Sequence, residues 1–300
     1  MSSRAKAYLA LTVTAVLWGA CLPIIKPVFA YINPFQFLYF RYLLAGVIVL
    51  PLVVFYLIKF RPAVKDLLTI AALELVQIFS LILLYLGLNK TSAIEASLIG
   101  ATDPIFLTLG GVLFLKEREN KQELKGLLIS FSGTVFLLLE PFLSGRNGGI
   151  TLSFFGNLLL FAYLLAITAY YLLAKVCYRR YPKMMVSSFS YPVCLLTLFG
   201  LNRWFNYSVS LSFFNQPVVL ITCAYMAVFG SIIAFTLYLY GQNLIEASEA
   251  SLFTYLHIPF SLLTAFFLLK EVISWPQFFA LIIIAWGVYL AEYRPRRYNR

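Results

Sequence analysis

The chain has 300 residues, of which 62% are hydrophobic and only 12% are charged, and its formal net charge is +11. An ordinary soluble domain carries about twice that charged fraction, so the composition excludes a typical soluble fold and favours an integral membrane protein. The apolar runs are continuous and about twice as long as the alternating segments of an outer-membrane barrel, which indicates helices.

Ten apolar segments are long enough to cross the hydrocarbon as helices, which takes about 20 residues each. In chain order we expect these spans at 7–28, 35–58, 67–87, 92–115, 122–141, 153–174, 184–202, 216–239, 246–269 and 275–293. The first run is too long for a cleavable signal and belongs to the repeated pattern, so it should remain as a helix.

Two parts of the sequence repeat each other at a spacing of 154 residues. Residues 93–98 (Ala-Ile-Glu-Ala-Ser-Leu) match residues 247–252 (Ala-Ser-Glu-Ala-Ser-Leu), and Leu-Lys-Glu occurs at 115–117 and again at 269–271. Two pairs of glycines keep the same spacing: Gly87 with Gly241, and Gly133 with Gly287. The matches indicate an internal duplication.

Each repeat should contain five helices, and an odd number reverses the orientation of the second repeat in the membrane. We therefore expect an all-α integral membrane protein, with ten transmembrane helices in two inverted five-helix repeats around a central cavity. The N-terminal repeat would cover 1–144 and the C-terminal repeat 145–300, with the turn-rich stretch Ser144-Gly145-Arg146-Asn147-Gly148-Gly149 between them.

The basic residues follow the positive-inside rule, which argues against a nucleic-acid partner. With the N-terminus inside, 17 lysines and arginines lie in inner segments and four in outer segments. The four outer residues are Lys90, Arg146, Arg203 and Lys270. This split predicts a bacterial cytoplasmic (inner) membrane protein with both termini in the cytoplasm and the lipid bilayer as its partner.

Several residue patterns, taken together, are typical of one family. Trp18-Gly19 is followed by Lys26, Pro34 and Arg41; Glu95-Ala96-Ser97 leads to Asp103-Pro104 and Lys116-Glu117; and Glu249-Ala250-Ser251 leads to Pro259 and Lys270-Glu271. Over nearly its whole length the chain resembles the drug/metabolite transporter (DMT) superfamily, EamA type. The resemblance implies a basket of ten helices around a central cavity. It implies no particular substrate, since members move amino acids and their derivatives, nucleobases, sugars and drugs.

Asp103 and His257 are the first candidates for a binding site. They occupy the same position in the two repeats, about 12 residues into their spans, and each lies one or two residues before a proline, Pro104 or Pro259. Proline frees a backbone carbonyl, and paired interrupted helices often mark a transport site. We expect both side chains to face one cavity from opposite walls. Alternatively, both are satisfied core residues.

The other ionisable residues inside spans have structural alternatives. Glu74, with Gln77 one turn further on, would bind a substrate ammonium or carry a proton, or else pair with Arg41. Lys26 and Arg41 would snorkel to the interface, pair with Glu74 or Asp103, or hold a substrate carboxylate. Glu95 and Glu249 lie at the start of their spans, where the positive end of the helix dipole stabilises an acidic side chain.

Aromatic residues near span centres are candidates for the cavity wall, where they would suit a flat or cationic solute. These are Trp18, Tyr163, Tyr170, Tyr191, Tyr225 and Tyr255.

The predicted function is a secondary transporter, working as an exporter or exchanger of small polar organic metabolites by alternating access without ATP. Amino acids or their derivatives are the expected solutes; nucleobase- or nucleoside-like metabolites, including S-adenosyl compounds, and cationic drugs are alternatives. A channel or scaffold, or a membrane-embedded transferase, are the alternative functions. We expect no enzyme activity, no cofactor and no metal. We expect coupling to protons or to a counter-substrate, and a protein that is a monomer or homodimer.

Overall fold

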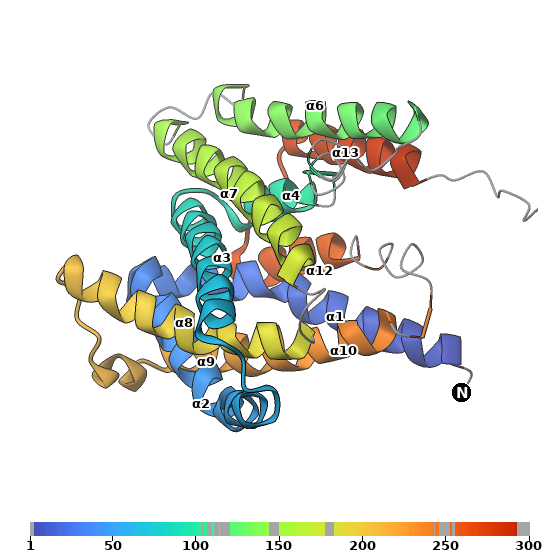
Figure 1. The fold of residues 1–300 in the computed structure, drawn as a ribbon. Helices are drawn as coiled ribbons and strands as arrows, with labels where there is room; N and C mark the ends of the chain where they lie inside the picture. Colours follow the sequence, from blue (N-terminus) through green and yellow to red (C-terminus); the bar gives the residue numbers. More distant parts are fainter. Residues whose placement is uncertain are drawn as a thin grey trace, which may run out of the picture.

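A computed structural model describes residues 3–103, 105–106, 110, 114, 121–143, 150–177, 183–242, 244–245, 253 and 256–292. These residues form helices and connecting turns, and no strand occurs among them (Figure 1). The helices are α1 (Ser3–Ile25), α2 (Pro34–Phe60), α3 (Val64–Lys90), α4 (Ala93–Gly100), α6 (Lys121–Leu143), α7 (Ile150–Cys177), α8 (Lys183–Trp204), α9 (Pro217–Tyr225), α10 (Ala234–Gln242), α12 (His257–Thr264) and α13 (Trp275–Glu292). The 3-10 helices η1 (Lys26–Ala30) and η2 (Leu211–Asn215) and the π-helices η3 (Met226–Ile233) and η4 (Ala265–Leu269) complete the set.

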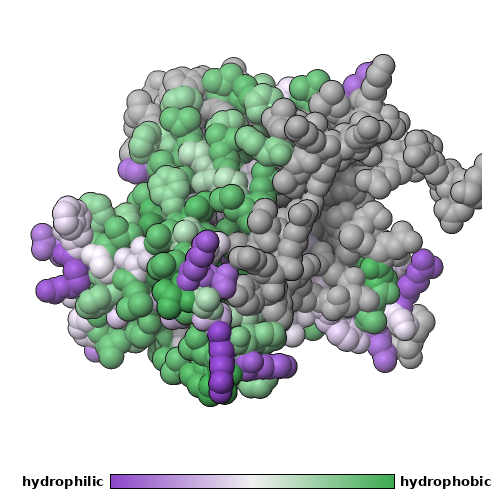
Figure 2. Space-filling model, viewed as in Figure 1, coloured by the Kyte–Doolittle hydropathy of each residue, from purple (hydrophilic) through white to green (hydrophobic). Residues whose placement is uncertain are grey.

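The described helices fit a membrane protein. Six helical segments are long and apolar enough to cross a bilayer: Ser3–Ala30, Pro34–Phe60, Val64–Lys90, Phe154–Ala174, Met185–Trp204 and Pro217–Tyr238. Two shorter apolar segments are His257–Leu269 and Trp275–Gly287. Large apolar side chains lie on the outside, and hydrophobic residues cover most of the described surface in Figure 2. Such a surface suits contact with lipid and would be costly in water.

Helix ends follow local signals in the sequence. The Asn33 side chain accepts from the Gln36 backbone N–H while the Gln36 side chain accepts from Asn33, so a capping box opens α2 just before Pro34. At the other end Arg61 adopts the left-handed conformation that closes a helix. The Ser92 side chain caps α4 by accepting from the Glu95 backbone N–H. The predicted spans 35–58 and 67–87 therefore lie inside α2 and α3.

Two of the expected spans are only partly described, and a third contains a π-helix. Span 92–115 begins as α4, and span 246–269 is helical from His257 onwards; much of the rest of both lies outside the described residues. The expected span 216–239 is built from α9, the π-helix η3 and α10 in succession. A π-helix breaks the regular α-helical hydrogen-bond pattern, and hydrophobic periodicity does not reveal that break.

Helices pair across the two halves of the chain. α6 lies along α13, at the top of Figure 1, while α3 packs on α7, α2 on α8, and α1 on both α10 and α12. Close approach depends on Gly87 and Gly241: a Cβ on Gly87 would lie 2.8 Å from Leu160 Cγ, and a Cβ on Gly241 would lie 2.6 Å from Leu11 Cγ. The glycines therefore let α3 approach α7 and α10 approach α1.

Candidate functional site

The side chain of Arg41 links three helices in the middle of the bundle. Its Nη1 donates to the Tyr85 hydroxyl on α3 at 2.6 Å, and its Nη2 donates to Ser231 Oγ on η3 at 3.0 Å. The guanidinium carbon lies 5.6 Å from the centre of the Tyr42 ring, within the range of a cation–π contact. Arg41 is thus held in the core by neutral groups, which differs from the expected snorkelling to the interface.

The π-helix η3 forms one wall beside Arg41. Trp18 Nε1 on α1 donates to the Gly230 carbonyl at 3.0 Å, and Ser231 Oγ donates to the Met226 carbonyl at 2.7 Å. Just before η3, the Tyr225 hydroxyl donates to the Leu17 carbonyl at 2.8 Å. Single π-turns inside α-helices occur often at functional sites. The bonds of Trp18 and Tyr225 therefore tie this irregular backbone to α1.

Glu74 lies on α3 with its side chain fully buried (0% exposed). Among the described residues neither of its carboxylate oxygens has a hydrogen-bond partner. Ser190 lies next to it on α8 and donates to Gln77 Oε1 at 2.6 Å. The alternative of a direct hydrogen bond between Glu74 and Arg41 is therefore wrong for this conformation. The reason is that Arg41 points to Tyr85 and Ser231 instead.

Two phenols lie near both of these groups. Tyr42 on α2 and Tyr191 on α8 are both within electrostatic range of Glu74 and of Arg41. Their rings are 5.9 Å apart. Glu74 and Arg41 are therefore near the same pair of phenols without bonding to each other. This arrangement offers a cationic and an anionic group to a polar solute.

Asp103 lies three residues after the end of α4 and is bonded to α7. Tyr163 donates its hydroxyl to Asp103 Oδ2 at 3.0 Å, while Oδ1 is buried without a partner among the described residues. Tyr163 was among the expected cavity residues, and here it anchors a carboxylate. One oxygen of Asp103 is therefore satisfied and one is left for another donor.

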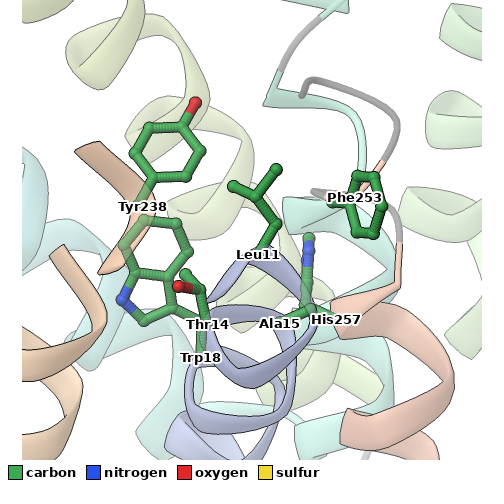
Figure 3. A pocket seen from close by; sticks show the side chains of 7 residues that line it. All are labelled: Leu11, Thr14, Ala15, Trp18, Tyr238, Phe253 and His257. Carbon is green, nitrogen blue, oxygen red and sulfur yellow. The ribbon is translucent and has the colours of Figure 1, made fainter. Parts of the chain in front are cut away.

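His257 is the first residue of α12 and lines a small pocket between α12, α1 and α10 (Figure 3). The other lining residues are Leu11, Thr14, Ala15, Trp18, Tyr238 and Phe253. Asp103 does not line this pocket, so the described residues do not bring Asp103 and His257 to opposite walls of it. The physical reason is that each residue turns to the helix packed on its own segment: Asp103 to α7, and His257 to α1.

The remaining candidates are dispersed. Tyr170 is buried on α7, and Tyr191 is partly buried on α8. Pro259 is exposed on α12. Pro104, Tyr255 and Glu249 lie outside the described residues.

Sequence reasoning missed a buried polar network around the start of α4. Glu271, in the turn after η4, accepts from the backbone N–H groups of Ala93 (3.1 Å) and Ile94 (3.0 Å). The Lys26 ammonium donates to the carbonyls of Leu88 and Thr91. Glu95 in the first turn of α4 accepts from Gln277 at 3.3 Å. The repeated Leu-Lys-Glu was the one sequence signal for Glu271.

Comparison with known proteins agrees with this architecture. The sequence model of the EamA-like transporter family matches residues 5–139 and again residues 154–293. Two relatives are each named an uncharacterized transporter. One, from Archaeoglobus fulgidus, is 24% identical over 96% of this chain and 97% of its own length; the other, YetK of Bacillus subtilis, is 25% identical over 97% of this chain and 88% of its own. A solved crystal structure, 16% identical, superposes with a TM-score of 0.62 over 96% of both chains, which supports the fold alone.

Proposed function

Because the chain belongs to the EamA-like transporter family, which matches both of its halves, we propose that it is a secondary transporter of small polar organic metabolites. The expected solutes are amino acids or their derivatives, moved as an exporter or exchanger by alternating access, without ATP. Nucleobase- or nucleoside-like metabolites, including S-adenosyl compounds, and cationic drugs are the competing solute classes.

The observation that carries the proposal is the pair of buried ionisable groups on α2 and α3. Glu74 is fully buried and neither of its oxygens has a hydrogen-bond partner among the described residues, while Arg41 bonds to neutral groups, Tyr85 and Ser231. Ionisable side chains inside a membrane are costly, so they mark substrate or ion pathways. A zwitterionic solute would satisfy both at once. Glu74 can also carry a proton, and coupling would then be to protons; exchange for a counter-substrate is the alternative.

Two inverted repeats, 1–144 and 145–300, would provide the moving parts. The pairing of helices supports this arrangement, since α3–α7 and α10–α1 are corresponding contacts exchanged between halves, and the glycine–leucine pairs Gly87–Leu160 and Gly241–Leu11 accompany them. Binding sites of such transporters lie at the repeat interface, near the bilayer midplane. Asp103 and His257, at corresponding positions, would then contact the solute in turn as the two halves rock.

The proposal includes the membrane, the orientation and the oligomeric state of the protein. We place it in the bacterial cytoplasmic membrane with both termini in the cytoplasm, as a monomer or homodimer without enzyme activity. The distribution of basic residues supports the orientation.

The proposal is tested with purified protein reconstituted in liposomes. A panel of labelled amino acids, nucleosides, S-adenosyl compounds and organic cations is offered without ATP. Saturable uptake of an amino acid above that of protein-free liposomes supports the proposal. Saturable uptake confined to another class corrects the substrate, and an ion conductance that does not saturate would favour a channel.

A further inference from the structure

The guanidinium of Arg41 lies in the core without a carboxylate partner among the described residues. Besides Tyr85, the groups that act most strongly on it are the phenols of Tyr42 and Tyr191 and the thiol of Cys21. Phenols and thiols are ordinarily uncharged near neutral pH, so none of them supplies a fixed negative charge. A buried charge without a counter-charge is costly, and it persists where it has a function.

Arg41 has donors to spare. A guanidinium carries five N–H groups in a planar fork, and the hydrogen bonds to described residues use one from each terminal nitrogen. Arg41 as a whole residue is partly buried, whereas its partner Tyr85 is only 2% exposed. The unused donors and the partial exposure of the residue leave room for a ligand atom.

The partners of Arg41 add a further donor. Ser231 gives its hydrogen to the Met226 carbonyl, so its oxygen accepts from Arg41. The Tyr85 hydroxyl also accepts from Arg41, and its own hydrogen goes to no described acceptor. A guanidinium edge beside a free hydroxyl donor suits the two oxygens of an anion.

The charge of the site favours a monoanion. The contacts of Arg41 with described residues are to Tyr85, Ser231 and Tyr42, none of which is basic. A phosphate monoester, with nearly two negative charges, would be left half neutralised. A carboxylate matches both the single charge and the planar geometry of the fork.

We propose that Arg41, with the Tyr85 hydroxyl beside it, binds the carboxylate group of the transported solute. This inference rests on the proposed transport function and narrows its substrate class to carboxylates. Glu74, which lies near the same phenols Tyr42 and Tyr191, would face the cationic or polar remainder of the solute.

The first test needs no solute. Thermal unfolding of the full-length protein in detergent is compared for wild type, Arg41→Met and the control Arg203→Met, which removes an exposed charge in the last turn of α8. If the charge is kept for a ligand, Arg41→Met unfolds at a higher temperature than wild type while Arg203→Met is unchanged. Unfolding of Arg41→Met below wild type overturns the proposal, because the charge would then be held for its structural bonds.

The second test uses pairs of probes that differ only in the anionic group: each of the amino acids with its carboxamide, together with inorganic phosphate. We expect at least one amino acid to raise the unfolding temperature of wild type and Arg203→Met. Its carboxamide should bind at least about tenfold more weakly, a difference of about 1.4 kcal/mol. Arg41→Met should lose the shift and Arg41→Lys should keep part of it. Equal shifts by acid and carboxamide, or a shift by phosphate alone, overturn the proposal.

Flux measurements separate this inference from the proposed function. Carboxylate binding that depends on Arg41, without any flux in liposomes, would leave the anion site standing and overturn the transport function. Saturable flux of carboxamides through the Arg41→Met protein would support the transport function and overturn the anion site.

Discussion

Ser130 and Ile284, which lie 154 positions apart, are joined by a hydrogen bond from Ser130 Oγ to the Ile284 carbonyl at 3.1 Å. The same spacing separates the repeated sequence motifs, so here a residue contacts its own counterpart. Counterparts touch each other only close to an axis that exchanges the two halves. The crossing of α6 and α13, which also holds Gly133 and Gly287, is therefore where a two-fold axis between inverted repeats would pass.

The glycine–leucine contacts provide a first prediction. Gly241→Ala should destabilise the protein by about 1–3 kcal/mol, because the new Cβ would lie 2.6 Å from the side chain of Leu11. Leu11→Ala should relieve that clash, so the double variant should be less destabilised than the sum of the single variants. Denaturation in detergent for all four proteins measures this coupling.

Gly87→Ala should be harder to rescue. Its Cβ would meet Leu160 and also the Gly156 carbonyl at 2.9 Å, and a backbone oxygen cannot be trimmed by mutation. The matched control is Gly200→Ala on α8, which meets nothing within 4 Å and should be neutral or stabilising.

For the first prediction, independent effects of Gly241→Ala and Leu11→Ala would contradict the packing described for α1 and α10.

Glu74→Gln should abolish or strongly reduce transport without loss of folded protein. Neither buried carboxyl oxygen has a hydrogen-bond partner among the described residues, so the substitution leaves no described donor without its acceptor. Initial uptake rates in liposomes and unfolding temperature in detergent are compared, with Asp66→Asn in the first turn of α3 as the control. Unchanged uptake by Glu74→Gln would leave Glu74 with a structural role only.

Asp103→Asn should reduce transport more than Tyr163→Phe does. Tyr163 satisfies one oxygen of Asp103, whereas a solute would contact the carboxylate itself. His257→Ala should also cut uptake while the protein still inserts and folds. Asp103→Asn and His257→Ala proteins that both transport at the wild-type rate would make these residues structural.

Glu271→Ala should destabilise the protein by about 2–3 kcal/mol, because it leaves the Ala93 and Ile94 N–H groups without their charged acceptor. Glu271→Gln retains one acceptor oxygen and should lose less. Chemical denaturation measures both. Equal stability of Glu271→Ala and wild type would show that the contact contributes nothing to the fold.

Sequence patterns were a good guide to features that depend on composition or local spacing. The apolar runs predicted α2 and α3 closely, because the length of a hydrophobic run is a local property of the sequence. The spacing between Gly87 and Gly241 indicated the duplication, and the structure adds that both glycines accommodate a leucine.

The contacts of the site could not be predicted in the same way. Arg41 bonds to Ser231, which is 190 positions away, and Ser231 is positioned by a π-helix that hydrophobic periodicity does not register. Asp103 and His257 were paired by symmetry of position. Their side chains nevertheless contact different neighbours: Asp103 contacts Tyr163, and His257 lines the pocket beside α1. The repeat relates their positions in the chain, but the side chains around each position differ.

Counterflow in liposomes tests transport by alternating access most directly. Vesicles containing the purified protein are loaded with an unlabelled amino acid that shifts its unfolding temperature, and are diluted into trace labelled solute without ATP or an ion gradient. A transporter will accumulate label transiently above equilibrium, and Glu74→Gln and Arg41→Met will lose most of that overshoot. Label that only equilibrates, at a rate proportional to concentration, would contradict alternating access and show that the protein is a passive pore.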